Sequence, residues 1–251
     1  HADGGWGWWS DDPTDIYMTA YTLWGLNEAA KAKITVDKQP IKKGVKYLSE
    51  QLTLQWAKDT KESYALHRLI FAQSVMLGLA PKSALAEKIK TDWAELMKGG
   101  YTNPSGLALI LSGATAAAAP ELKSTALSLL AKQAKTNAAG TYSEIREKDG
   151  YYYWYNDREE TTAQVLNALL AAGAQKQIAV HDVVSYLMAQ KKQHRWRSTK
   201  LSALITRGFA AYALQTGEKP GKTRVIATVD GERRDVEYDP KKSDAQALKL
   251  V

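Results

Sequence analysis

The sequence predicts an all-α fold, an alpha/alpha toroid of helical hairpins that forms an incomplete ring, followed by a short C-terminal β hairpin. Three observations predict it. Apolar residues recur with the period of an α-helix over most of residues 1–217. Similar helical segments return at intervals of roughly 40 to 55 residues, the period of stacked two-helix units. After residue 220 the pattern changes to that of a β hairpin.

Five segments are predicted to form the inner helices. Each begins after a loop that is rich in glycine or aromatic residues, and each is small and apolar on most sides. Alanine and glycine side chains let neighbouring helices approach closely, so these segments are expected to be buried against one another. They are residues 14–30, 61–79, 104–116, 159–172 and 198–216.

Four amphipathic, lysine-rich segments alternate with the inner ones and are predicted to form the outer helices. They are residues 39–52, 83–97, 122–134 and 179–190. The period alone leaves an open solenoid and a closed toroid as alternatives. A closed ring of about six hairpins needs more helices than these, so the first hairpins are expected upstream of this sequence.

The C-terminal segment is predicted to be a β hairpin over residues 223–238, with Asp230-Gly231 as its two-residue turn. The chain is therefore divided into residues 1–217, the toroid, and residues 218–251. This second part is either the start of a following β-domain or a β appendage of the toroid. The first alternative is favoured because a lone hairpin is marginally stable.

Length and composition exclude several classes of protein. With 251 residues, 45% of them hydrophobic and 24% charged, the chain resembles an ordinary globular domain with a sizeable core. It contains no cysteine, which excludes disulfides, thiolate nucleophiles and cysteine-bound metals within these residues. The net charge of +7 is compatible with nucleic acid. The lysines are, however, scattered over predicted solvent faces, and no nucleic-acid partner is expected.

The loop at residues 3–15 is the first candidate site. It reads Asp-Gly-Gly-Trp-Gly-Trp-Trp-Ser-Asp-Asp-Pro-Thr-Asp. Paired carboxylates act as general acid and base in glycosidases, so Asp11, Asp12 and Asp15 are candidates for such a pair. Acidic residues also stabilise the start of a helix. We favour this structural role, with Asp12 or Thr14 capping the first helix.

A second aromatic loop, Gly-Tyr-Tyr-Tyr-Trp-Tyr-Asn-Asp at residues 150–157, precedes another predicted inner helix. Tyrosine rings offer flat apolar faces with polar tips, which suit the binding of sugar or peptide. Shorter loops of this kind begin at Tyr101 and His194. Because one hairpin after another uses the pattern, packing or docking is favoured over catalysis.

Motifs for other chemistries are absent from the sequence. The histidines His1, His67, His181 and His194 lack the spacing of metal ligands. There is also no nucleophile elbow and no glycine-rich phosphate-binding motif. His67 lies in an apolar segment and is predicted to be a packed core side chain. No cofactor, no metal and no catalytic residue are expected.

Two pairs of motifs carry a resemblance to a known family. The run at residues 3–9 is followed by Thr-Ala-Tyr-Thr-Leu-Trp-Gly-Leu at residues 19–26, and Glu-Thr-Thr-Ala-Gln at residues 160–164 is followed by Trp-Arg-Ser-Thr-Lys at residues 196–200. Together they resemble the helical thioester domain of bacterial alpha-2-macroglobulins, in which a glutamine usually stands at the position of Lys200. The hairpin also lies where that family passes from toroid to β-domain.

The resemblance implies a fragment of an endopeptidase inhibitor that is cleaved in a bait region and then traps the protease. Family members form a thioester between a cysteine and a glutamine of a Cys-x-Glu-Gln motif, which precedes the Asp-Gly-Gly-Trp loop and is not in this chain. The resemblance further implies a periplasmic parent protein, anchored to the inner membrane through a lipid elsewhere. Its partners would be neighbouring β-domains of the same parent chain and, through the parent, target proteases.

This chain is accordingly expected to be a structural and docking module and not an enzyme. A basic run at residues 191–197 adds a candidate contact patch. The alternatives are a toroidal terpene cyclase or prenyltransferase, and a six-hairpin glycosidase. The candidate docking surface consists of Trp6, Trp8, Trp9, Tyr151, Tyr153, Trp154, Tyr155 and Trp196.

Overall fold

The computed structural model describes the chain except for residues 60–62, 145–157, 193–194, 218–222, 230–231 and 239–251. The chain divides into two compact units, His1–Gly208 and Phe209–Val251. We describe each unit by itself.

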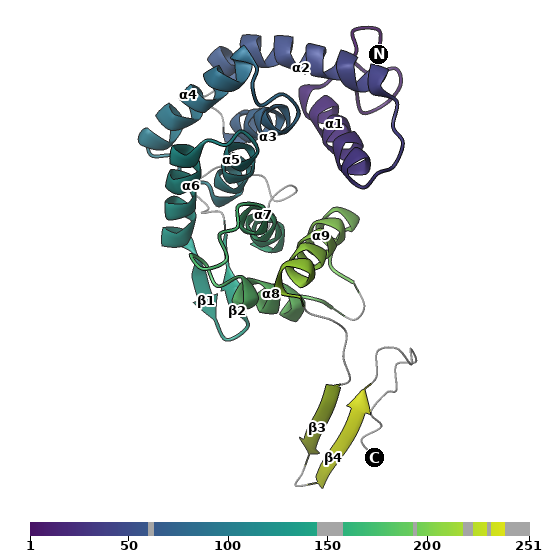
Figure 1. Cartoon of the computed structure of the whole chain (residues 1–251), viewed down its shortest axis with the longest axis vertical. Coiled ribbons are helices and arrows are strands. Elements are labelled where there is room, and N and C mark those ends of the chain that lie inside the picture. The colour runs from purple at the N-terminus through teal and green to yellow at the C-terminus, as the bar shows by residue number, and fades with distance from the viewer. Residues whose placement is uncertain (60–62, 145–157, 193–194, 218–222, 230–231, 239–251) are drawn as a thin grey trace. The chain divides into compact units, whose positions relative to one another are not determined.

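Unit 1 consists of two layers of helices along an arc, with the outer helices on its convex side (Figure 1). The inner helices are α1 (Ile16–Lys31), α3 (Ser63–Leu79), α5 (Pro104–Ala116), α7 (Arg158–Ala171) and the first part of α9 (Thr199–Thr216). The outer helices are α2 (Lys38–Asp59), α4 (Ala84–Lys98), α6 (Pro120–Gln133) and α8 (Val180–Ala189). The predicted all-α fold with an incomplete ring is confirmed.

The predicted helix bounds agree with the structure to about two residues, within the error expected of such bounds, except at the end of α2. That helix continues past the predicted end at Leu52 to Asp59. No glycine or proline lies between these two residues to end it. The Thr53 hydroxyl instead donates to the carbonyl of Ser49 at 3.0 Å, a bond within the helix.

Inner helix α5 shows how the sequence produces a buried helix. The Asn103 side chain caps it by accepting from the Gly106 amide at 3.0 Å, and Pro104 occupies the first turn. Gly106 and Gly113 leave room for aromatic neighbours. A Cβ at Gly106 would lie 2.0 Å from the Tyr101 hydroxyl, so the loop that precedes the helix packs directly onto it.

Outer helix α4 shows the amphipathic alternative. Ser83 caps it, and its buried residues, Ala86, Ile89, Trp93 and Met97, recur every three or four positions and so form one stripe. The fully buried Trp93 joins the two layers, since its Nε1 donates to Oε1 of Gln73 on α3 at 2.6 Å. A Cβ at Gly113 of α5 would lie 2.6 Å from its ring.

A small hairpin that was not predicted lies between α6 and α7. Strands β1 (Lys135–Asn137) and β2 (Gly140–Tyr142) pair antiparallel. Gly140 adopts a φ of +132°, and a Cβ there would lie 2.2 Å from the carbonyl oxygen of Asp182 on α8. The glycine is therefore required both by the turn and by the contact with α8.

Unit 2 contains the predicted C-terminal hairpin, strands β3 (Thr223–Val229) and β4 (Glu232–Tyr238), which pair antiparallel from Thr223↔Tyr238 to Val229↔Glu232. Arg224 and Asp235 form an exposed ion pair across the strands. The hairpin itself is confirmed, whereas its place at the start of a β-domain stays a prediction. Among the described residues no helix is long and apolar enough to cross a membrane.

Candidate functional site

The inner helices of unit 1 begin at one common end, which we call the start face. Side-chain contacts join neighbouring inner helices within their first two turns. The Ser105 hydroxyl of α5 donates to Oε1 of Gln164 on α7, and Lys200 Nζ of α9 lies 2.6 Å from Oε1 of Glu160 on α7. The inner helices therefore run parallel, with their positive dipole ends at the start face.

The glycine-rich N-terminal loop is fixed against this face. Gly4 has a φ of +94°, and a Cβ on Gly5 would lie 2.2 Å from the Thr14 methyl group. The Trp6 amide donates to the Thr19 hydroxyl at 2.9 Å. A hydrogen bond from the Thr14 side chain, the larger influence, and one from the Gly5 amide hold the pKa of Asp3 below its usual value. The loop is thus positioned by packing and hydrogen bonds together.

Asp15 caps helix α1, so the predicted capping by Asp12 or Thr14 is wrong. The helix begins at Ile16, and Oδ1 of Asp15 accepts from the Met18 amide at 2.9 Å. Its Oδ2 forms an ion pair with Arg68 of α3. Since both carboxylate oxygens of Asp15 have structural partners, we assign it to stability and not to acid/base catalysis.

The other two candidate carboxylates have no comparable arrangement. Asp11 is exposed and accepts a hydrogen bond from the neighbouring Ser10 hydroxyl at 2.8 Å. Asp12 is half-buried. Within the described part of the chain, no group of three or more histidine and carboxylate side chains is arranged to hold a metal ion.

A buried ion pair between Glu160 and Lys200 lies at the start face. Only 7% of the Glu160 side chain is exposed, against 35% for Lys200. Burial raises the pKa of Glu160, while the Lys200 charge acts in the opposite direction. Burial, the largest single influence, lowers the pKa of Lys200, but Glu160 together with Tyr17 and Tyr21 raises it, and the net shift of this pKa is upward. The ammonium group is therefore charged and is a poor nucleophile.

His67 was predicted to be a core residue. It is half-buried and faces an internal cavity, while its Nδ1 is closed off from solvent. Burial, with a smaller contribution from the Lys200 charge, lowers the pKa of His67 to about 3. The ring is neutral at pH 7 and too weak a base for general base catalysis.

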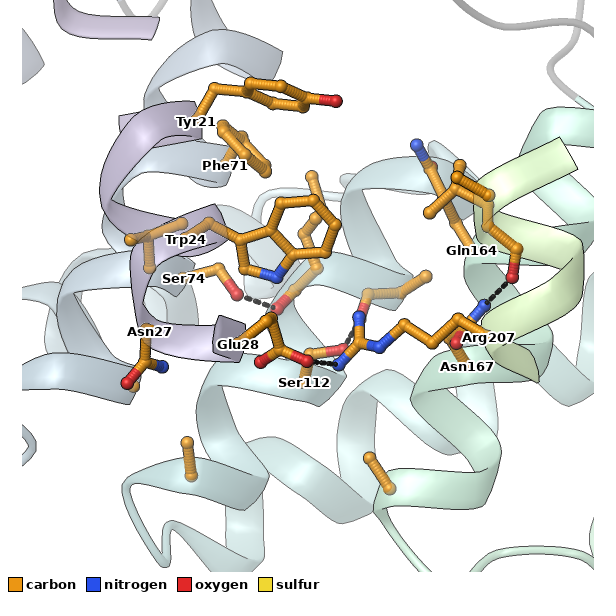
Figure 2. A pocket seen from close by; sticks show the side chains of 18 of the residues that line it. Tyr21, Trp24, Asn27, Glu28, Phe71, Ser74, Ser112, Gln164, Asn167 and Arg207 are labelled. Carbon is orange, nitrogen blue, oxygen red and sulfur yellow. Dashed lines mark hydrogen bonds and ion pairs between the residues drawn. The ribbon is translucent and has the colours of Figure 1, made fainter. Parts of the chain in front are cut away.

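The internal cavity, which we call the lumen, lies between the inner helices and has a volume of about 410 Å³. Tyr21, Trp24 and Phe71 line one side, and Ser112 and Arg207 are among the residues on the others (Figure 2). Arg207 of α9 forms an ion pair with Glu28 of α1 at 2.9 Å. The lumen is the concave feature around which the rest of unit 1 is arranged.

The predicted docking residues fall into three groups. Trp8 and Trp9 are 53% and 76% exposed. Trp6 packs on α2, where a Cβ at Gly44 would lie 2.5 Å from its ring, and Trp196 donates through Nε1 to the Leu187 carbonyl at 2.9 Å. Tyr151, Tyr153, Trp154 and Tyr155 lie outside the described residues.

Several residues of this region were not singled out from the sequence. Arg68, Trp24, Glu28 and Arg207 all lie on predicted inner helices, but only their side-chain partners reveal a role. The signal that was present is the occurrence of Glu28 and Arg207 on helices that are otherwise small and apolar. A charge on such a helix indicates a partner across the ring.

No model of a protein family matches the sequence, and a comparison with curated protein sequences finds no match. Solved structures of bacterial alpha-2-macroglobulins are nevertheless similar in fold. Salmonella alpha-2-macroglobulin reacted with methylamine matches with a TM-score of 0.65 and 15% identity, over 94% of this chain and 14% of that one. A native Escherichia coli alpha-2-macroglobulin spanning domain MG7 to the C-terminus matches with a TM-score of 0.64 and 18% identity, over 94% and 35%.

Protease-treated forms are similar too. Trypsin-activated alpha-2-macroglobulin from Escherichia coli matches with a TM-score of 0.63 and 15% identity, over 95% of this chain and 16% of that one. The predicted resemblance is confirmed at the level of the fold, and the chain spans only a small part of the proteins it resembles. Because the match covers 94% of this chain, it includes at least part of unit 2.

Proposed function

We propose that this chain is part of a bacterial alpha-2-macroglobulin-like endopeptidase inhibitor and serves within it as a docking module. The observation that carries the proposal is the match to alpha-2-macroglobulins over 94% of the chain. The match includes residues of both units. A chance likeness between two helical rings would be expected to cover the helical unit alone.

The docking role rests on the start face. Trp8 and Trp9 are large apolar side chains exposed on a loop that is otherwise tightly fixed. Tryptophan is enriched at the energetic centres of protein interfaces, and a rigid loop loses little entropy when a partner binds. The proposed partners are neighbouring β-domains of the same parent protein, which sits in the periplasm, anchored to the inner membrane.

The chemistry of capture is proposed to lie outside this chain. Without cysteine, the chain itself cannot form a thioester. Its buried charges also have structural partners, as Asp15 pairs with Arg68 and Glu160 with Lys200. These pairings support a module that positions and shields other parts of the protein and has no catalytic role of its own.

The test is a trapping assay on the protein that carries this chain. It is incubated with trypsin, and two activities are followed, the cleavage of a small chromogenic peptide and the degradation of casein. A trap leaves the first activity intact and suppresses the second, because a caged protease admits only small substrates. Undiminished degradation of casein at a molar excess of the protein would overturn the proposal.

The docking role has its own control. Trp8→Ser and Trp9→Ser together should weaken trapping without changing the unfolding midpoint. Trp196→Ser is the control for an effect that acts through folding: its indole is hydrogen-bonded within unit 1, so its loss should lower the unfolding midpoint. Loss of trapping with an unchanged unfolding midpoint supports docking through the start face. Full trapping by the double variant would exclude Trp8 and Trp9 from it.

A further inference from the structure

The lumen of unit 1 is large enough to hold a small molecule. Its volume of about 410 Å³ falls in the range of small-molecule sites, on the order of 300 to 1,000 Å³. Small residues keep it open. A Cβ on Gly78 would meet no atom within 4 Å, and Ala108, Ala116 and Ala203 also line the space. Larger side chains at these positions of the inner helices would fill the cavity.

One wall of the lumen is aromatic. Tyr17, Tyr21 and Trp24 of α1 and Phe71 of α3 form a continuous group, with ring centroids 5.2 to 6.4 Å apart. Rings at such distances in stacked or tilted arrangements present flat faces to a neighbour. The wall is therefore suited to a planar aromatic or extended apolar group.

Unused hydrogen-bond donors lie beside this wall. The Arg207 guanidinium stands 5.4 Å from the centroid of the Trp24 ring, and Figure 2 shows both side chains directed into the lumen. Among the described residues, Glu28 is the one hydrogen-bonding partner of Arg207, whose side chain is 44% exposed, so most of its five N–H donors are available to a ligand. Trp24 Nε1 also has no acceptor within the described part of the chain. These donors suit a ligand that supplies acceptor oxygens.

The charge balance around Arg207 is positive. Glu28 is shared between Arg207 at 2.9 Å and Lys31 at 2.8 Å, so one carboxylate faces two cations. The other two cations of the lining, Arg68 and Lys200, each have a carboxylate partner, Asp15 and Glu160. An anionic group at Arg207 would complete the balance.

We propose that the lumen binds a small amphipathic acid, whose aromatic or apolar body lies against Trp24 and Tyr21 and whose acid oxygens accept from Arg207. Charge-assisted bonds to a guanidinium are the strongest that this lining offers, and the aromatic wall supplies most of the buried area. The proposal does not rest on protease trapping, since the residues that line the lumen all belong to unit 1; Trp8, proposed above as a docking residue, is also one of them.

Two fluorescent probes test the proposal on the full chain. Anilinonaphthalene sulfonate has an aromatic body and one anionic group, and N-phenylnaphthylamine has nearly the same body without the charge. Saturable binding of one anilinonaphthalene sulfonate per chain is expected, and it should be about tenfold tighter than binding of the neutral probe. Absence of saturable binding, or equal affinity for both probes, would overturn the proposal.

A matched pair of variants locates the site. Ser112 lines the lumen, and among the described residues its hydroxyl bonds only to the Ala108 carbonyl of its own helix, at 2.9 Å. Thr125 on outer helix α6 is exposed and makes the equivalent bond to the Glu121 carbonyl at 2.9 Å. Ser112→Trp should lower affinity for both probes at least tenfold by filling the lumen, while Thr125→Trp should not change it. Unchanged binding by Ser112→Trp would place the probe elsewhere.

A third variant separates charge from volume and does not depend on the fold tolerating a tryptophan in the lumen. Arg207 is 44% exposed, so Arg207→Gln removes the charge without creating a buried cavity. It should weaken anilinonaphthalene sulfonate about tenfold and leave N-phenylnaphthylamine within about twofold. Equal effects on the two probes would contradict the assignment of the acid group to Arg207.

Discussion

Inner helix α5 and outer helix α4 are neighbours in the same ring but are stabilised differently. Helix α5 buries nine of its 13 residues, and α4 buries four of its 15. The inner helix has neighbours on several sides, so its small residues and its cap determine how closely they approach. The outer helix packs along one stripe and exposes its charged face.

The comparison shows where the stability of the ring is concentrated. Changes on the inner layer, or where the two layers meet, disturb close packing that cannot relax. Changes on the exposed face of the outer layer disturb only solvated charges. Four tests probe this difference, from the largest expected effect on stability to the smallest.

The largest loss of stability is expected from changes at Trp93, which joins the two layers. Trp93→Ala should lower the free energy of unfolding by about 3 to 5 kcal/mol, because a fully buried ring is replaced by a cavity. Urea unfolding followed by circular dichroism measures it. Trp93→Phe, which keeps most of the ring but leaves Gln73 Oε1 without its donor, should lose about 1 to 3 kcal/mol. An alanine variant as stable as the phenylalanine variant would contradict the account.

Two glycines of inner helices should respond in opposite directions. Gly113→Ala places a methyl group 2.6 Å from the Trp93 ring and should cost about 1 to 3 kcal/mol. Gly25→Ala meets no atom within 4 Å and should gain about 0.5 to 1 kcal/mol from the better helix propensity of alanine. Thermal unfolding of both variants checks the pair. The same sign for both would show that the layers are not packed as described.

A smaller effect is expected from pH. The pKa of His67 is lowered by burial to about 3, so the unfolded chain binds its proton more readily. Stability should therefore fall as the pH drops below about 6.5, by at most about 1.4 kcal/mol between pH 7.5 and 5.5. The raised pKa of Glu160 acts in the opposite direction and makes the loss smaller.

The variant His67→Gln isolates this contribution. Its free energy of unfolding, measured by urea titration at both pH values, should depend less on pH than that of the unchanged chain. If both proteins lose the same amount between pH 7.5 and 5.5, protonation of His67 is not what weakens the fold.

The smallest effect is expected on the exposed face of outer helix α2. Lys46 and Glu50 form an i,i+4 ion pair at 4.0 Å, with 79% of the lysine side chain and 60% of the glutamate side chain exposed. Glu50→Gln should cost at most about 0.3 to 0.5 kcal/mol, and less at high salt. Unfolding at low and high ionic strength measures both statements. A loss of stability as large as that expected for Gly113→Ala would contradict the difference between the two layers.

The helices could be predicted from the sequence because each one depends on a local pattern. Helix α5 follows from the Asn103 cap and Pro104, and α4 from its stripe of apolar residues. The hairpin β1–β2 could not be predicted, because strands of three residues are too short to show alternation. The need for Gly140 arises from its contact with α8, which is a tertiary feature.

The candidate site was predictable only in part. The aromatic loops and Trp8 and Trp9 stand out by composition. The ion pair between Asp15 and Arg68 could not be predicted, because the two residues are 53 positions apart and meet only when the inner helices stack in parallel. The capping residue was also misplaced, since Asp12, Thr14 and Asp15 are all chemically suited to the position, and the contact with Arg68 favours Asp15.

The central claim, a docking module in a protease trap, is tested most directly by hydrogen exchange on the whole protein that carries this chain. Backbone exchange is measured before and after cleavage by trypsin. If the start face is released on cleavage, amides of residues 7–10 should exchange about tenfold faster afterwards, while those of outer helix α6 should not change. Identical exchange at residues 7–10 in the two states would contradict the claim.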